Sequence, residues 1–270
     1  WCQLFSEPDA GSDLASLRTV ARPTDGGWLV SGQKVWTSYA RYARWGIALV
    51  RTDPDAPRHR GLSCLVVDMT QPGIEVRPLR QITGGAEFSE VFLDDVFVAA
   101  DQLVGGLHQG WSVANTTLAH ERGTSFPFKE QVVHEVYLDE LVRLAAERSR
   151  LEDPLAADAL AQAFVELRVL RLHNWRTLSR LGRGEEPGPE SSWIKLAWTE
   201  MTQHLSRTAL DVLGDESPLW PEPDGTVSAG TWQRQWLWSR AASIAGGTSE
   251  IQRTVIGERI LGLPREPLPA

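Results

Sequence analysis

Residues 1–105 consist of short apolar runs separated by turn residues. The run at 28–32 follows Asp25-Gly26-Gly27, a turn signal placed directly before a strand. Similar runs, punctuated by Pro and Gly, predict further strands at 46–52, 62–68, 74–79 and 90–98. Because no helix-length segment separates these runs, we expect an antiparallel β-barrel or sandwich domain over residues 1–105.

From about residue 106 the apolar positions recur at helical spacing. Leu107, Trp111, Ala114 and Leu118 are separated by steps of four, three and four, which places them on one face of a helix. Longer amphipathic stretches predict helices over 129–150, 155–181 and 190–213, and residues 218–230 are expected to form a loop.

The last predicted helix begins at Thr248 or Ser249 and runs to about Leu261. Ser249 and Gln252 fit a capping box at its start. Several long helices with short connections are typical of a bundle. The pattern therefore predicts an α+β chain, in which the β-domain is followed by an up-and-down helical bundle over residues 106–270.

Composition and charge exclude several classes of protein. The net charge is −8, from 27 basic and 35 acidic residues, which argues against a general nucleic-acid binder. No run approaches the roughly 18 apolar residues of a membrane-spanning helix, and the opening Trp1-Cys2-Gln3-Leu4-Phe5 does not look like a signal peptide. No G-x-G-x-x-G follows a predicted strand, so a Rossmann-type nucleotide site is not expected.

Cysteine and histidine usage carries no sign of a disulfide framework or a metal centre. Cys2 and Cys64 are too few for a disulfide scaffold, and we expect them to be free thiols in a reducing cytoplasm. The six histidines form no ligand pattern, so we expect no metal site.

Three segments place glycine, hydroxyl and aromatic or acidic residues side by side. They are Ser-Glu-Pro-Asp-Ala-Gly-Ser-Asp at 6–13, Gly-Gln-Lys-Val-Trp-Thr-Ser at 32–38 and Gly-Gly-Thr-Ser-Glu-Ile-Gln-Arg at 246–253. They are similar to the T-E-P-x-A-G-S-D, G-x-K-x-W-I-T/S and E-G-T-S-E-I-Q-R segments of the acyl-CoA dehydrogenase family. The chain therefore resembles the middle and C-terminal domains of that family. The resemblance implies that the family's N-terminal helical domain is absent, and that residues 1–270 alone have weak activity or none.

The first two segments suit a flavin, which needs hydrogen bonds at its polar edge and apolar or aromatic cover on its faces. The resemblance implies that Phe5, Ser6, Trp36 and Ser38 contact FAD, with Ser6 near flavin N5 and O4 and Trp36 over the ring. It places that ring between the β half and the helical half of the chain. Without the resemblance, a polar turn and a core tryptophan are the alternative.

Two further segments are assigned by the same resemblance. Gly11 would let the backbone come close to the cofactor, and Ser12 would lie near the CoA portion of the substrate. Glycines followed by a hydroxyl cap expose backbone N–H groups at a helix start, which favours an anion; the resemblance implies that Thr248 and Glu250 contact FAD there. An ordinary helix cap is the alternative. The Q-x-x-G-G segment, with which the family often binds FAD across a subunit interface, is not matched by residues 211–214.

The catalytic base is where the sequence departs from many members of the family. Gly246 stands where those members carry a glutamate. Residues 118–122, Leu-Ala-His-Glu-Arg, resemble the L-x-x-E-R of a branch whose base lies on this helix, which makes Glu121 the candidate base. Glu121 also continues the apolar stripe, and burial would raise the pKa of its carboxyl and strengthen it as a base. The alternative is a plain ion pair with Arg122.

Two residues would assist the base. Arg122 would orient the base region or touch CoA, with a structural role as the alternative. Gly246 keeps the backbone N–H that polarises the thioester carbonyl in the family, so it could still stabilise the transition state.

The resemblance implies an FAD-dependent flavoprotein oxidoreductase of lipid metabolism. It would dehydrogenate an acyl-CoA thioester between the α and β carbons, with α-proton abstraction by a carboxylate and β-hydride transfer to flavin N5. A non-catalytic partner subunit of a hetero-oligomer and an acyl-CoA oxidase stay open as alternatives. Expected partners are an acyl-CoA substrate, an electron-transfer flavoprotein or similar acceptor, and further subunits in a homo-oligomer (dimer or tetramer) or hetero-oligomer.

Overall fold

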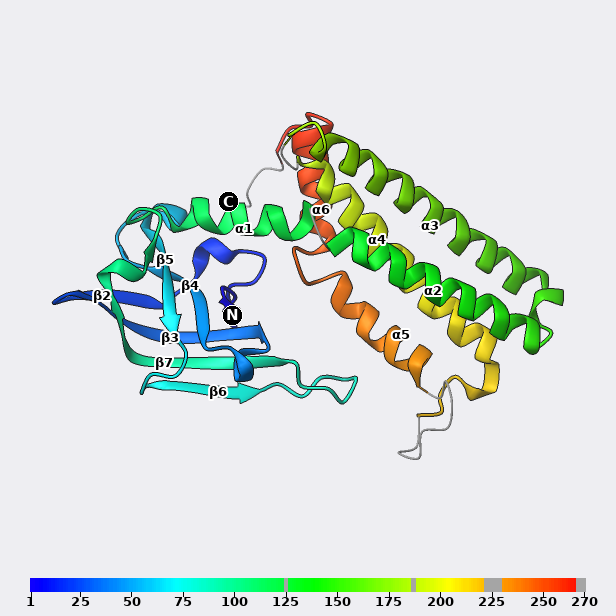
Figure 1. The fold of residues 1–270 in the computed structure, drawn as a ribbon, viewed down its shortest axis with the longest axis horizontal. Helices are drawn as coiled ribbons and strands as arrows, with labels where there is room; N and C mark the ends of the chain where they lie inside the picture. The colour runs from blue at the N-terminus through cyan, green and yellow to red at the C-terminus, as the bar shows by residue number, and fades with distance from the viewer. Residues whose placement is uncertain (124–125, 186–187, 221–229, 266–270) are drawn as a thin grey trace. The chain divides into compact units, whose positions relative to one another are not determined.

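The structure is a computed structural model that describes residues 1–123, 126–185, 188–220 and 230–265, apart from the side chains of residues 119, 121–123 and 126–127. It divides into two compact units, Trp1–Thr117 and Leu118–Ala270. The first unit holds the strands and the second the long helices (Figure 1). The domain boundary predicted at 105/106 stays a prediction, since the helix that begins at Gly110 continues from one unit into the other.

The β unit is built on one mixed sheet. Its strands are β1 (Cys2–Leu4), β2 (Val20–Thr24), β3 (Gly27–Ser38), β4 (Trp45–Arg51), β5 (Leu62–Asp68), β6 (Ile74–Pro78), β7 (Phe88–Ala99) and β8 (Leu103–Val104). They are ordered β6-β7-β3-β2-β4-β5-β8, and β1 pairs with β4. Most pairs are antiparallel, whereas β1–β4 and β2–β4 are parallel.

The predicted β-domain is confirmed, and of the two forms expected for it the sheet takes the sandwich-like one. Within the described residues, β6 and β8 lie at opposite ends of the strand path, so the sheet is open and sandwich-like. A barrel would need those two end strands to pair with each other. The core of the unit is formed by apolar side chains of the central strands, among them Leu4, Val30, Val50, Leu65 and Val91.

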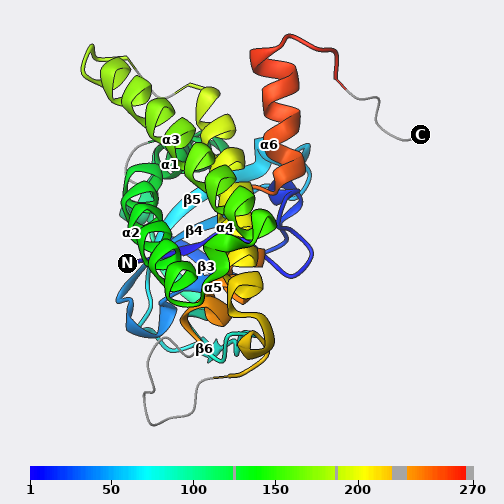
Figure 2. The same ribbon diagram turned by 90° about the vertical axis from the view of Figure 1, so that its right-hand side faces the viewer.

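The helical unit consists of long helices that run alongside one another. The described helices are α1 (Gly110–Gly123), α2 (Phe126–Glu147), α3 (Pro154–Leu181), α4 (Glu190–Leu213), α5 (Thr231–Ala242) and α6 (Ser249–Val255), and α6 continues as a π-helical turn over Ile256–Ile260. Figures 1 and 2 show α2, α3, α4 and α5 side by side with alternating chain direction. The predicted up-and-down bundle is confirmed, and its core includes Leu141, Leu170, Trp198 and Ala209.

Local sequence explains where α3 begins. The Asp153 carboxylate accepts a hydrogen bond from the N–H of Leu155 at 3.0 Å, and Pro154 occupies the first helical position. A side-chain acceptor at the N-cap satisfies a backbone donor that has no partner within the helix, and proline fits the first turn because it lacks an N–H.

Two helix predictions need correction, and one helix was missed. α1 begins at Gly110, so Leu107 is outside the helix and half exposed; His108 adopts a left-handed backbone conformation just before the start. α6 is capped by Thr248, whose hydroxyl accepts from the N–H of Ile251, rather than by Ser249. α5 was not predicted, because its tryptophan-rich and glutamine-rich sequence has no clear helical stripe.

Candidate functional site

The first two sequence motifs lie side by side in the β unit. The N–H of Val35 donates to the carbonyl oxygen of Ser6 at 2.9 Å, which joins the segment after β1 to the middle of β3. Phe5 is buried and Ser6 half-buried. The residues that the sequence assigned to a flavin ring in these two motifs are therefore neighbours in the fold.

Trp36 lies at a β-bulge. Between Lys34 and Thr37, β3 takes three steps while the paired residues of β7, Val91 and Ser89, are two steps apart. Trp36 has φ +59°, in the left-handed region that a bulky residue rarely occupies. Bulges of this kind redirect side chains, and they are frequent next to active sites.

The bulge changes which side chains face outward. Lys34 before the bulge, Val35 within it and Thr37 after it are all buried, while Trp36 is 61% exposed and Ser38 is exposed. The Trp36 indole meets the ring of Phe88 edge-on, with 6.0 Å between ring centroids. An open aromatic face next to a hydroxyl residue results, which a flat cofactor with a polar edge could use.

Gly11 and Ser12 lie in an exposed turn. Glu7 and Ala10 exchange two backbone hydrogen bonds, of 3.1 Å and 3.0 Å, which close the turn that precedes Gly11. A Cβ placed on Gly11 would meet nothing within 4 Å. The space next to Gly11 is therefore open for a close approach of a ligand.

Sequence reasoning missed a buried ion pair beneath these motifs. The Lys34 ammonium is fully buried and lies 2.8 Å from a carboxylate oxygen of Glu7, which is also buried. Burial lowers the pKa of Lys34 to about 8, although the Glu7 carboxylate opposes this shift. Burial by itself would raise the pKa of Glu7, but the Lys34 charge and hydrogen bonds from Lys34, Thr19 and Arg18 bring it below its ordinary value. Lys34 stands between Gln33 and Val35 in a stretch of mixed polarity, so no local pattern marked its side chain as buried.

The third motif forms a tight turn in the helical unit. Gly246 and Gly247 have φ +65° and +94°, values that glycine adopts without steric cost. The amide of Gln252, which is fully buried, donates to the carbonyl oxygens of both glycines at 3.1 Å. The Lys195 ammonium of α4 donates to the carbonyl oxygens of Ala242 and Gly247 at 2.9 Å and 2.8 Å.

Thr248 and Glu250 take different positions at the start of α6. Thr248 caps the helix, as described above, and Glu250 is exposed. The pKa of Glu250 is lowered by a backbone hydrogen bond in the first turn and by the Thr248 hydroxyl. Its carboxylate is therefore charged at neutral pH.

Glu121 and Arg122 lie in the last turn of α1, and their side chains lie outside the described part of the chain. The part of the stripe that leads to them is present in α1: Ala114 is fully buried and Trp111 partly buried. The assignments of Glu121 and Arg122 stay predictions.

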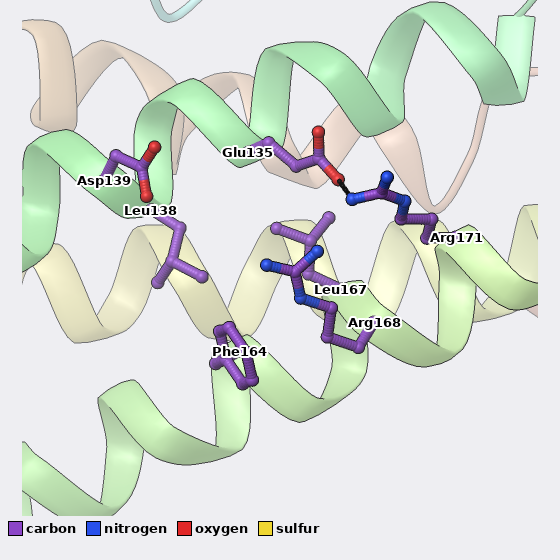
Figure 3. Close-up of a pocket in the computed structure, with 7 residues that line it drawn as sticks. All are labelled: Glu135, Leu138, Asp139, Phe164, Leu167, Arg168 and Arg171. Atoms are coloured by element: carbon purple, nitrogen blue, oxygen red, sulfur yellow. Dashed lines mark hydrogen bonds and ion pairs between the residues drawn. The ribbon is translucent and has the colours of Figure 1, made fainter.

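A pocket of about 130 Å³ lies between α2 and α3, and none of its lining residues is a predicted site residue (Figure 3). Leu138, Leu167 and Phe164 line it together with charged side chains. Arg171 lies 3.3 Å from Glu135, and the Arg168 guanidinium lies over the Phe164 ring, 4.8 Å from its centroid. The cations in the pocket are therefore already engaged by neighbouring side chains.

Two family models match the chain. Residues 2–96 match the middle domain of acyl-CoA dehydrogenase, and residues 108–261 match its C-terminal domain. The fold and these matches define the architecture of the middle and C-terminal domains of an acyl-CoA dehydrogenase. The chain belongs to the acyl-CoA dehydrogenase family.

Curated relatives agree with this assignment. The chain is 44% identical over 266 residues to the acyl-CoA dehydrogenase IpdE1 of Mycobacterium tuberculosis, which covers 98% of this chain and 67% of that protein. It is 46% identical over 274 residues to the acyl-CoA dehydrogenase FadE34 of the same organism, which covers 98% of this chain but 35% of that protein. The chain thus spans only part of each relative.

Solved structures show the same fold. The Tcur3481-Tcur3483 steroid ACAD matches with a TM-score of 0.88 and 28% identity, over 98% of this chain and 68% of that one. The ChsE4-ChsE5 complex from Mycobacterium tuberculosis matches with a TM-score of 0.83 and 32% identity, over 98% of this chain and 69% of that one.

The family implies a flavin cofactor, and the residues present fit one. The bulge leaves the Trp36 indole open, the carbonyl of the half-buried Ser6 accepts from the N–H of Val35, the neighbour of Trp36 in the chain, and Ser38 is exposed. Aromatic cover with adjacent hydroxyl groups matches the needs of an isoalloxazine ring.

Among the described residues, both cysteines are free and buried. None of the described helices is long and apolar enough to cross a membrane.

Proposed function

We propose that this chain forms the middle and C-terminal part of an FAD-dependent acyl-CoA dehydrogenase that introduces a double bond between the α and β carbons of an acyl-CoA thioester. The observation that carries the proposal is the outward-facing Trp36 at the bulge of β3, adjacent to Ser6, in a chain of this family. FAD, when bound, supplies a hydride acceptor.

The chain's own residues would bind the cofactor and the substrate. Phe5, Ser6, Trp36 and Ser38 would hold the ring of the cofactor, Thr248 and Glu250 would contact another part of it, and Gly11 would leave room for it. Ser12 and Arg122 would bind the CoA portion of the substrate.

Two positions would act on the reacting atoms. Glu121 would remove the α-proton, as a carboxylate whose basicity burial would increase. The N–H of Gly246 would donate a hydrogen bond to the thioester carbonyl as negative charge develops there. The left-handed backbone at Gly246 would set the direction of that N–H.

A visible spectrum of the purified protein tests the proposal. We expect bound flavin absorbance, and bleaching of that absorbance when the matching acyl-CoA is added without oxygen. The panel should include fatty, branched, aromatic and steroid side-chain thioesters, because one similar structure is a steroid ACAD. A peroxide assay on admitting air then separates a dehydrogenase from an oxidase, and the same reduced protein can be offered electron-transfer flavoprotein as acceptor.

A second candidate function is that of a non-catalytic partner in a hetero-oligomer. Gly246 in the place of the usual glutamate favours it, and a similar structure is a complex of two different chains. This candidate would be supported against the first if the purified protein carried no flavin and no thioester changed its visible spectrum, but the protein completed the activity of a second chain. The cytoplasmic location and the subunit number stay predictions.

A further inference from the structure

The buried pair Glu7–Lys34 contacts both flavin motifs without reaching the surface. Lys34 has three donor hydrogens, and all three have acceptors: the carbonyl oxygens of Phe5 at 3.1 Å and Leu49 at 2.7 Å, and the Glu7 carboxylate at 2.8 Å. A lysine that is fully buried and fully hydrogen-bonded has one orientation. Its ammonium therefore fixes the distance between the segment after β1 and strand β4.

The Glu7 carboxylate extends this connection to the segment that leads into β2. One oxygen accepts from the N–H of Thr19 at 2.9 Å and the other from the N–H of Arg18 at 2.6 Å. Thr19 in turn packs against β3: a Cβ on Gly32 would lie 2.4 Å from its Oγ1 and 2.7 Å from its Cα. The motif at 32–38 thus needs Gly32 for this close approach and Lys34 for the ion pair.

Each residue of the segment 5–7 is bound to β3 near the bulge. The carbonyl of Phe5 and the carboxylate of Glu7 accept from Lys34, and the carbonyl of Ser6 accepts from Val35. Lys34 is the last residue in register with β7 before the bulge, and Trp36 is inside it. A left-handed tryptophan is disfavoured by itself, so it persists only where the surrounding contacts determine the backbone.

We propose that Glu7 and Lys34 are positioning residues for the flavin, because together they hold the β3 bulge in the conformation that turns Trp36 outward and keep Ser6 beside it. The pair does not touch the cofactor; it acts through the backbone at Ser6, Val35 and Trp36. The cofactor half of this inference rests on the proposed function, whereas the effect on the bulge does not.

The test follows Trp36 directly in flavin-free protein. The purified protein is labelled with 5-fluorotryptophan, and the ¹⁹F resonance of Trp36 is identified by its loss in Trp36→Phe. Lys34→Met and Glu7→Gln are compared with wild type under conditions in which far-ultraviolet circular dichroism shows each to be folded. The matched control is Arg77→Met, which breaks an exposed pair with Glu75 on β6 of the same sheet.

We expect the Trp36 resonance to shift or split in Lys34→Met and Glu7→Gln, while the resonance of Trp198 in the helical unit stays in place. The dissociation constant for FAD, titrated by flavin fluorescence, should rise at least tenfold in both variants, and Arg77→Met should match wild type in both measurements. If Lys34→Met does not fold, Lys34→Arg keeps the charge but places its donors differently, and it should show the same two changes to a smaller extent.

Folded variants in which the Trp36 resonance is unchanged would overturn the proposal, and so would a shifted resonance with unchanged FAD affinity. The proposed function fails separately: wild-type protein that binds no FAD contradicts it, whether or not the Trp36 resonance responds to Lys34.

Discussion

His134 illustrates how much one buried side chain can depend on its protonation. It lies between α2 and α4, with Nδ1 2.7 Å from the Glu130 carbonyl oxygen and Nε2 2.9 Å from the Thr202 hydroxyl. Burial lowers its pKa, although the backbone hydrogen bond opposes the shift. Tyr137 and Trp198 meet the imidazole edge-on, and the Glu130 carboxyl lies 3.9 Å away. The ring is therefore neutral at neutral pH.

This arrangement predicts a loss of stability in mild acid. Below the ordinary histidine pKa of 6.5 the unfolded chain protonates His134, whereas the folded chain does so only below its lowered pKa. The unfolded state then binds more protons, so the free energy of unfolding falls as the pH falls. We expect urea titrations between about pH 7 and 5 to show that the free energy of unfolding falls less in His134→Gln than in wild type. The exposed His59→Gln should show the same fall as wild type.

Glu130 acts in the opposite direction and provides a check. Burial raises the pKa of the Glu130 carboxyl, although the Lys129 charge opposes the shift. The folded state therefore binds this proton at a higher pH than the unfolded state does, and this contribution to stability increases as the pH falls. Glu130→Gln should therefore steepen the acid-induced loss of stability. If the free energy of unfolding depended on pH equally in wild type and His134→Gln, His134 would not be the cause of the acid-induced loss of stability.

The base assignment also belongs to the single residue. Glu121→Gln keeps the shape of the side chain but removes the proton acceptor, and general base catalysis contributes about 10²–10⁴-fold. We expect turnover of the full-length, FAD-loaded protein to fall by at least about 10²-fold with FAD affinity unchanged. Glu147→Gln, on the exposed face of α2, is the control; unchanged turnover in Glu121→Gln would place the base elsewhere.

At the scale of elements, Lys195 connects α4 to the turn that precedes α6. Its ammonium donates to carbonyl oxygens at the end of α5 and in the Gly246–Gly247 turn. Lys195→Met would leave these acceptors without that donor, at a cost of about 1–3 kcal/mol. We expect a lower free energy of unfolding and faster amide exchange at 246–249. Lys129→Met, at an exposed lysine of α2, should change neither; normal exchange at 246–249 in Lys195→Met would argue that Gln252 alone holds the turn.

Elements with clear boundaries could be predicted from the sequence, and others could not. α4 over Glu190–Leu213 and β5 over Leu62–Asp68 coincide with their predicted ranges, because glycine or proline flanks each of them and the apolar pattern between is regular. β1, β2 and β8 were missed. They are short, and β2 carries Arg22 and Pro23, so pairing with their neighbours rather than local pattern makes them strands.

The candidate site was predictable in its composition but not in its geometry. The motifs name Ser6 and Trp36 directly, but the outward direction of Trp36 depends on the register of β3 against β7, which no local pattern encodes. The Glu7–Lys34 pair joins residues of two motifs, and a lysine inside a buried strand predicts that such a partner exists without saying which carboxylate it is.

At the scale of the whole molecule, exposed apolar side chains on the outer helices indicate association. Val165, Val169 and Leu172 of α3 are exposed at helical spacing i, i+4, i+7, and Val132 and Val136 of α2 are exposed as well. Contiguous exposed apolar surface is typical of protein–protein contact regions.

We therefore expect the purified protein to self-associate, or to bind a second chain of the same family, through α3. Light scattering after size-exclusion chromatography should report a mass above the 30.0 kDa of one chain. Val169→Glu with Leu172→Glu should reduce that mass, whereas Leu155→Glu, at the exposed start of α3, should not. A monomeric wild type that captures no related chain would contradict the expectation.

The extra residue in β3 is what reconciles the burial of Lys34 with the burial of Thr37. These two residues lie three positions apart, and side chains of a regular strand at that spacing face opposite sides of the sheet. Deleting Val35 would restore one-to-one pairing with β7 and leave Thr37 opposite Ser89, but the N–H that donates to the carbonyl of Ser6 would be lost with Val35. Such a chain would keep nearly every letter of the motif and lose the bulge, so counting residues between Lys34 and Ser38 is as informative as naming them.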